Sequence, residues 1–133
     1  IAARRVGPSG RIVAVEPFPP NLLLLRRHLG LNRRSNVSII EGALSDHDGE
    51  GYLREGPSSS ECCLSDSGIR VHCFTLDTLV FRNGLPAPEV LKIDVEGAEG
   101  DVLRGALKCS LATAPVSGWP FIVVRFLKNV GRS

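Results

Sequence analysis

The sequence lacks several features that would assign a protein quickly to a functional class. No apolar run approaches the ~20 residues that a membrane-spanning helix needs, so we expect no membrane span. There is no Gly-x-Ser-x-Gly motif, no phosphate-binding loop ending in Gly-Lys-Ser/Thr and no Cys/His catalytic pairing. No internal repeat is present. These absences exclude the common hydrolase and nucleotide-triphosphatase signatures.

The four cysteines and three histidines also lack an informative spacing. Cys62 and Cys63 are adjacent, and Cys73 and Cys109 are scattered. This pattern matches neither a zinc site nor a disulfide framework, and the histidines show no ligand spacing. We therefore expect no metal, and we expect reduced thiols in a cytoplasmic protein.

The size and the first residues predict a single, incomplete domain. With 133 residues, 43% of them hydrophobic, the chain has enough apolar material for one modest core. There is no starting Met and no secretory leader, and Ile1 to Val6 reads as the tail of a helix. We therefore expect one partial domain over residues 1–133.

The net charge of +2 hides an uneven distribution. Residues 1–34 carry seven arginines and one acid, a balance of +6, whereas residues 35–101 have a balance of −9 and residues 102–133 one of +5. The basic first part could contact phosphate. However, no interleaved aromatic residues or nucleic-acid motif accompany it, so we favour a solvated helix face and expect no nucleic-acid partner.

Strand and helix signals alternate along the chain, which predicts an α/β fold with a parallel sheet. The expected strands are Arg11–Glu16, Asn36–Ile40, Ile69–Leu76 and Val90–Asp94, with Phe121–Val124 as one further strand. The expected helices are Leu22–Leu31, a short helix capped by Thr75 or Asp77, and Ala98–Lys108 with Val102, Leu103, Ala106 and Leu107 buried. We expect a loop at Glu41–Asp46, a turn at residues 47–51, little regular structure at 51–68 and a linker at 109–118.

Acidic residues follow two of the predicted strands. Glu16 ends the first strand, and Asp94 and Glu96 follow the apolar run at Val90–Ile93. Because the carboxyl ends of parallel strands meet at one sheet edge, we expect neighbouring strand ends to direct these acids into one crevice. A carboxylate has two acceptor oxygens, which match two adjacent ribose hydroxyls. The pattern therefore favours a hydroxyl-rich, cationic ligand.

Each of these acids also has a structural interpretation. Glu16 could be a surface acid before a proline break, and Asp94 could cap the following helix rather than orient a substrate or act as a general base. Acids in a first helical turn are favoured by the helix dipole, which applies to Glu96 and Glu99. For Asp77 we favour a helix cap over a catalyst.

The segment Ala43-Leu44-Ser45-Asp46 lies where an adenine would sit if a ribose were bound at Glu16. Its small and apolar residues would line the ring, and Ser45 or Asp46 could accept a hydrogen bond from the exocyclic amine. The same segment is also compatible with an ordinary loop.

Several sequence motifs occur in a recognisable order over residues 10–106. They are Gly10–Pro17, Asn21 with Leu29 and Asn32, Asn36-Val37, Ala43–Asp46 with Gly49, Thr75-Leu76-Asp77, Leu91–Glu99 and Val102–Ala106. In this ordered set, which is most specific in the run Lys-Ile-Asp-Val-Glu-Gly-Ala-Glu, the chain resembles the FkbM-type S-adenosylmethionine-dependent methyltransferases.

The resemblance implies a Rossmann-like class I methyltransferase fold and transfer of a methyl group, typically to an oxygen of a small molecule or a sugar hydroxyl. By this likeness S-adenosyl-L-methionine is the cofactor, and a small-molecule methyl acceptor is the partner. The implied cofactor-binding residues are Glu16 at the ribose with Pro17 beside it, Ala43 and Leu44 at the adenine with Asp46 nearby, and Asp94. Asp94 and Glu96 would lie by the methionine end and the acceptor as the catalytic pair.

The chain departs from the family pattern at both ends. The family's first strand and its glycine-rich loop are missing, and the segment 109–133 diverges. There, Phe121–Phe126 would stand in for the next strand of the sheet, with Arg125 where the family usually has an acid. We therefore expect an incomplete version of the fold with a family-like core at 10–106.

Three other functions are compatible with the same sequence. The first alternative is a catalytically inactive Rossmann-like fragment that acts as a binding or interaction module. A nucleotide-cofactor oxidoreductase of similar fold would need a glycine fingerprint that this sequence does not contain. The third alternative is a nucleic-acid-binding module, which rests only on the basic residues of the segment 1–34.

Overall fold

The computed structural model describes residues 10–33, 35–55, 62–88, 90–95, 97–111 and 121–125. The expected helix tail at residues 1–6 and the predicted site residue Glu96 lie outside these ranges. The strands are β1 (Ile12–Glu16), β2 (Val37–Glu41), β3 (Ala43–Leu44), β4 (Gly49–Glu55), β5 (Cys62–Ser65), β6 (Ile69–Phe74), β7 (Val90–Asp94) and β8 (Phe121–Arg125). The helices are α2 (Pro19–Leu31), α3 (Leu76–Phe81), α4 (Glu99–Arg104) and α5 (Leu107–Leu111).

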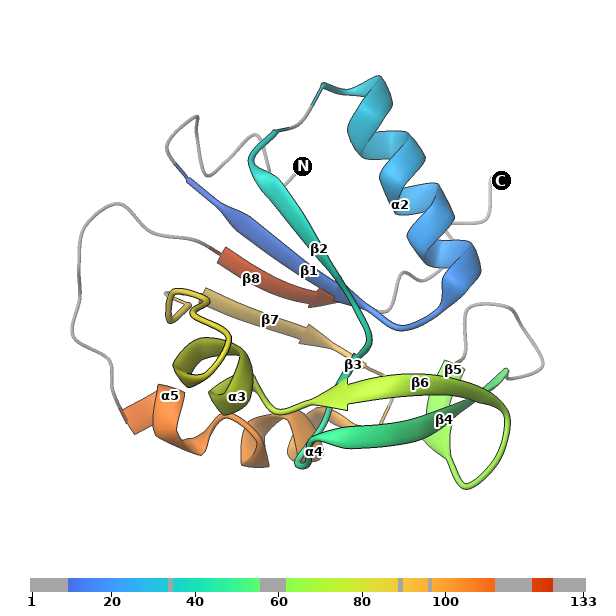
Figure 1. Ribbon diagram of the computed structural model, residues 1–133, viewed down its shortest axis with the longest axis vertical. Coiled ribbons are helices and arrows are strands. Elements are labelled where there is room, and N and C mark those ends of the chain that lie inside the picture. The colour runs from blue at the N-terminus through green and yellow to red at the C-terminus, as the bar shows by residue number, and fades with distance from the viewer. Residues whose placement is uncertain are drawn as a thin grey trace.

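Four strands form a parallel sheet in the order β2-β1-β8-β7 (Figure 1). Its central strand β1 is almost fully apolar, and Val13 and Val15 are buried at 4% and 1% exposure. The same figure shows α2 along one side of this sheet and α3 and α5 side by side, and Leu76 and Leu79 of α3 belong to the same core as Val13 and Val15 of β1. This arrangement confirms the predicted mixed α/β class.

The position of β8 differs from the sequence-based expectation. Phe121–Phe126 was expected to replace the next strand of the sheet, but β8 lies between β1 and β7 and pairs with both. Phe121 is in register with Ile12 on one side and with Val90 on the other. The physical reason is that β8 pairs the backbone groups on the facing edges of β1 and β7, which are costly to leave unpaired when buried.

A second sheet has the strand order β3-β6-β4-β5. It overturns the expectation that residues 51–68 are irregular and that 47–51 is only a turn, because β4 begins at Gly49 and pairs antiparallel with β5 and β6. The expected loop at Glu41–Asp46 likewise contains β3, which pairs parallel with β6. Burial drives this pairing, since Leu53 and Cys73 are 1% and 0% exposed.

The two sheets are joined at Gly42, where the chain turns from β2 into β3. Gly42 has φ +151°, and a Cβ there would lie 2.6 Å from the carbonyl oxygen of His72 and 2.7 Å from the ring of Phe74. Only glycine allows β6 to approach this corner so closely. The corner therefore brings the second sheet against the carboxyl end of β2.

Helix α2 begins at Pro19, three residues before the predicted start at Leu22, and α3 has one of its two predicted caps. Prolines occupy the first turn of α2, Leu22 is buried, and Leu25 and Leu29 on the same face are half-buried. The Thr75 hydroxyl accepts a hydrogen bond from the backbone N–H of Thr78 at 3.0 Å, so Thr75 is the N-cap of α3.

The helix predicted at Ala98–Lys108 is broken into α4 and α5 at Gly105. Val102 and Ala106 are buried as predicted, but Leu103 and Leu107 are 52% and 60% exposed, which corrects that part of the prediction. The break follows from a close contact, because a Cβ on Gly105 would lie 2.1 Å from the carbonyl oxygen of Ser45. The turn at Gly105 changes the face that α5 presents to the core.

None of the helices in the described ranges is long and apolar enough to cross a membrane.

We predict that Gly105→Ala lowers the free energy of unfolding by about 1–3 kcal/mol, since the added methyl group forces the α4–α5 turn away from Ser45. Denaturant unfolding followed by circular dichroism measures the change. Gly30→Ala is the matched control, because nothing lies within 4 Å of its Cβ and its helix should gain up to about 1 kcal/mol. Equal stability of Gly105→Ala and the parent would contradict the packing argument.

Candidate functional site

The predicted acids lie in one row at the carboxyl edge of the parallel sheet. The register pairs Glu16 with Glu41, Val15 with Val124, and Asp94 with Arg125. Glu16 and Asp94 therefore share the row but are separated by β8, which corrects the expectation that their strands are neighbours. Two strand spacings place their backbones about 10 Å apart.

Glu16 is a buried carboxylate rather than a surface acid. It is 1% exposed, and the backbone N–H of Phe18 donates a hydrogen bond to its Oε1 at 2.9 Å. Pro17, which follows it, is buried as well. Because a buried charge is costly without polar contacts, this turn holds the carboxylate in a defined orientation. A ligand reaches Glu16 only when the chain that covers it moves aside.

Asp94 lies at the end of β7 and is accessible. Its side chain is 38% exposed, and the Lys92 ammonium contacts Oδ2 at 2.8 Å. An exposed pair of this kind adds at most about 1 kcal/mol of stability, so its main effect is to position the carboxylate. Glu99 is exposed in the first turn of α4, where the helix dipole favours an acid.

The predicted adenine segment divides into a buried and an exposed part. Ala43 and Leu44 are each 1% exposed and belong to the hydrophobic core, whereas Asp46 is exposed. Asp46 Oδ1 is 2.8 Å from His47 Nδ1, and its Oδ2 is 3.6 Å from Arg104 Nε. The hydrogen bond with His47 lowers the pKa of Asp46 below its usual value of 3.8 and outweighs the small effect of desolvation.

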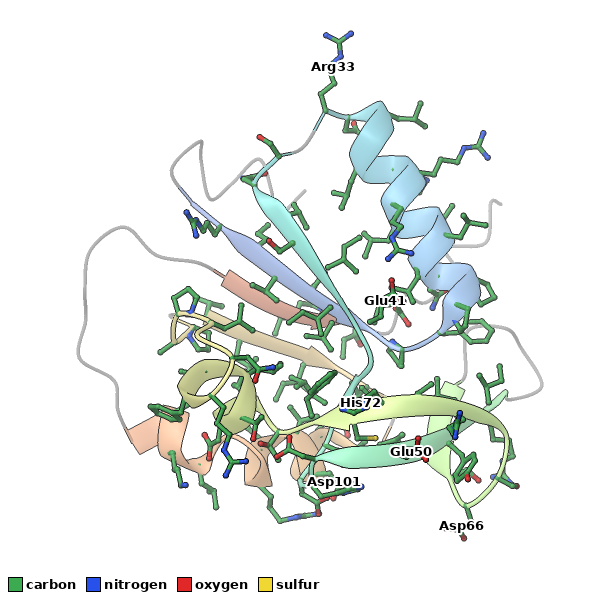
Figure 2. All side chains as sticks on the ribbon, viewed as in Figure 1. Arg33, Glu41, Glu50, Asp66, His72 and Asp101 are labelled. Carbon is green, nitrogen blue, oxygen red and sulfur yellow. The ribbon has the colours of Figure 1, made fainter. Side chains whose placement is uncertain are left out.

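An open groove of about 470 Å³ adjoins this edge of the sheet, between the start of α2, the end of β2 and β6. It is lined by Pro17, Pro19, Leu22, Leu23, Arg26, Glu41, Gly42, Arg70, Val71 and His72. Figure 2 labels Glu41 at the end of β2 and His72 on β6, the two elements that flank it. Arg26 pairs with Glu41 at its mouth.

The structure does not bring all the predicted site residues into this groove. Pro17 is among the lining residues, but Glu16 and Asp94 are not. Asp46 lines a different groove, of about 290 Å³, together with residues of α3 and with Arg104. Arg70 and His72 line the groove from β6, and no role at the site was expected for them from the sequence.

Asp77 is a helix cap, as favoured from the sequence, but for a different helix than expected. Its two oxygens accept hydrogen bonds from the backbone N–H groups of Lys108 and Cys109 at 3.0 and 2.9 Å, at the start of α5. Desolvation raises the pKa of Asp77, yet these backbone hydrogen bonds outweigh it and lower the pKa below 3.8. Both carboxylate oxygens of Asp77 thus bind backbone groups of α5, so Asp77 is not placed for catalysis.

Asp48 is a structural residue that the sequence analysis missed. Its carboxylate accepts hydrogen bonds from the backbone N–H of Thr75 at 2.8 Å and from the Thr78 hydroxyl at 2.6 Å. The Thr78 hydrogen bond is the main reason that the pKa of Asp48 is lowered. The signal in the sequence was an aspartate in the turn before β4 and two threonines three residues apart.

The sequence of the chain matches one protein family. The family model described as the methyltransferase FkbM domain matches residues 1–116, which confirms the resemblance seen in the motifs. No curated protein and no solved structure gives a match to the chain.

We predict that Asp77→Ala lowers the free energy of unfolding by about 1 kcal/mol at pH 7, because α5 loses its cap. The pKa of Asp77 is lowered in the folded state, so its contribution is complete above the unfolded value of 3.8 and is lost as the pH falls through the folded pKa. Thermal unfolding of parent and variant between pH 2 and 7 should therefore converge at the acidic end.

The control for this experiment is Asp66→Ala, at an exposed turn between β5 and β6 (Figure 2). We expect a change within about 0.5 kcal/mol. A constant difference between parent and Asp77→Ala down to pH 2 would contradict the role of the ionised carboxylate.

Proposed function

Because the chain belongs to the methyltransferase FkbM-domain family, we propose that it transfers a methyl group from S-adenosyl-L-methionine to an oxygen of a small molecule or a sugar. Family membership itself indicates methyltransferase activity. The observation that carries the finer proposal is the row of acids at the carboxyl edge of the parallel sheet, where α/β folds bind their ligands.

We further propose that the fold is Rossmann-like. The order β2-β1-β8-β7 corresponds to the order 3-2-1-4 of doubly wound sheets, with β8 in the position of the first strand. All pairs in this sheet are parallel. In such sheets the ligand binds at the carboxyl ends of the strands where the strand order reverses, which is between β8 and β7 in this chain.

In this proposal Glu16 binds the ribose of the donor. Its two acceptor oxygens suit the two adjacent hydroxyls, and the hydrogen bond from Phe18 holds it in one orientation. The adenine then extends into the groove beside Pro17 and Gly42. Ala43 and Leu44, which follow Gly42, lie in the core behind this corner, and Asp46 lines the separate groove beside α3.

Asp94 lies two strands from Glu16, on the side proposed for the methionine end and the acceptor, and Glu96 follows it in the sequence. S-adenosyl-L-methionine would supply the methyl group from its sulfonium sulfur, and Asp94 would accept the proton that the acceptor hydroxyl loses. A negative carboxylate also suits the sulfonium charge of the donor. Positioning of the two reactants supplies much of the rate in such a displacement.

One observation favours the alternative of an inactive binding module. Glu16 is 1% exposed, so binding of a donor requires the site to open first. An inert descendant could keep the same scaffold with the site permanently closed. Calorimetry separates the two candidates, because only the methyltransferase binds S-adenosyl-L-methionine.

We propose a cytoplasmic setting for this activity. Cys73 and Cys109 are buried and free. Free thiols are usual in the cytoplasm, where cysteines are kept reduced. Burial raises the pKa of Cys109 to about 12, so its thiol is protonated and does not serve as a nucleophile.

We predict that Glu16→Gln weakens binding of S-adenosyl-L-methionine about 10- to 100-fold, because hydrogen bonds to a charged group contribute about 1.5–3 kcal/mol. Isothermal titration calorimetry gives the dissociation constants. Asp66→Asn, at an exposed turn away from the groove, is the control for loss of a carboxylate and should bind like the parent. Unchanged binding by Glu16→Gln would remove the ribose assignment, and a parent that binds no donor would favour the inactive module.

We predict that Asp94→Asn lowers the turnover rate at least about 100-fold while changing the free energy of unfolding by less than about 1 kcal/mol. Formation of S-adenosylhomocysteine in the presence of a panel of hydroxyl acceptors measures turnover. Asp66→Asn serves as the control for loss of an exposed carboxylate. Full activity of Asp94→Asn would show that Asp94 is not the base.

A further inference from the structure

One face of β6 carries a row of planar side chains. Arg70 and His72 are exposed and Phe74 is half-buried, whereas Val71 and Cys73 alternate with them toward the core. The rings of His72 and Phe74 are in contact, with their centroids 4.4 Å apart and their planes inclined by 49°. A guanidinium, an imidazole and a phenyl ring therefore follow one another at every second residue of one strand.

This row forms one wall of the groove at the edge of the parallel sheet. Arg70 and His72 line it from β6, Pro17 lines it from the β1–α2 turn, and Leu22 lines it from α2. The corner at Gly42 makes this possible, because the ring of Phe74 occupies space that any Cβ would need. The groove consequently has an apolar side, formed by Pro17 and Leu22, and a side of planar, polar groups, formed by Arg70 and His72 of β6.

The charges in the groove favour a neutral planar ligand over a phosphate. Arg26 is paired with Glu41, and Arg70 has Glu50 at 3.4 Å. Both arginines are thus already partly neutralised, and an anionic group would have to compete with these carboxylates. A heteroaromatic ring would instead stack on His72 and gain from the guanidinium of Arg70 without breaking either pair.

We propose that β6 provides a stacking wall for the purine of the methyl donor, with His72 as the side chain that contacts the ring. The inference rests on the proposed function, since it takes the ribose to be at Glu16. Pro17 follows Glu16 in the chain, and Glu41 is in register with Glu16; both Pro17 and Glu41 line the groove. The base of a nucleoside whose ribose is bound at Glu16 therefore lies at the entrance of the groove. The second sheet therefore takes part in recognition of the donor.

The test uses calorimetric titration of the full 133-residue chain with two probes, S-adenosyl-L-methionine and adenosine. His72→Ala should weaken the binding of both probes about tenfold, which is the effect of losing one stacking contact to a base. His72→Phe should restore most of the affinity, because a phenyl ring keeps the stacking surface. His28→Ala, at an exposed histidine near the end of α2, is the matched control and should bind like the parent.

The possible failures can be told apart. If His72→Ala binds both probes like the parent while Glu16→Gln does not, the stacking wall is wrong and the proposed function stands. If His72→Phe binds as weakly as His72→Ala, a hydrogen bond or charge replaces stacking as the explanation, which overturns the inference. If the chain binds adenosine in a His72-dependent way but not S-adenosyl-L-methionine, the wall stands and the proposed function fails. If neither probe binds, both fail.

Discussion

The pairing of β8 with both β1 and β7 is the interaction on which the arrangement of the site depends. A parallel strand in the middle of a sheet needs partners on two sides, and β8 gives β1 its second partner while also pairing with β7. Its register sets the row that contains Glu16 and Asp94. A slip of one residue would turn the side chains of the slipped strand to the opposite face and move the two acids out of a common row.

A second constraint is the glycine corner between β2 and β3. It brings β6 close to the end of the parallel sheet, and the groove forms where the two sheets meet. Around this junction three aspartates bind donors of the protein itself: Asp48 binds the start of α3, Asp77 the start of α5, and Asp46 contacts His47 and Arg104. Asp48 and Asp77 thereby hold the starts of α3 and α5 in place.

The burial of Glu16 connects stability with function. A carboxylate that is covered and oriented by the Phe18 N–H belongs to the packed interior as long as no ligand is bound. A ligand that binds only the open form must supply the free energy of opening, and its apparent affinity falls by the fraction of open molecules. Donor binding and local opening around Glu16 are therefore linked in the proposed mechanism.

Short-range patterns in the sequence determined much of this protein. The apolar runs at β1 and β7, the prolines that begin α2, the Thr75 cap and the ordered family motifs all act within a few residues, so they could be read without a structure. Only the tertiary structure decided the place of β8, the break at Gly105 and the helix that Asp77 caps. These features depend on contacts between segments far apart in the chain, for which local periodicity carries no signal.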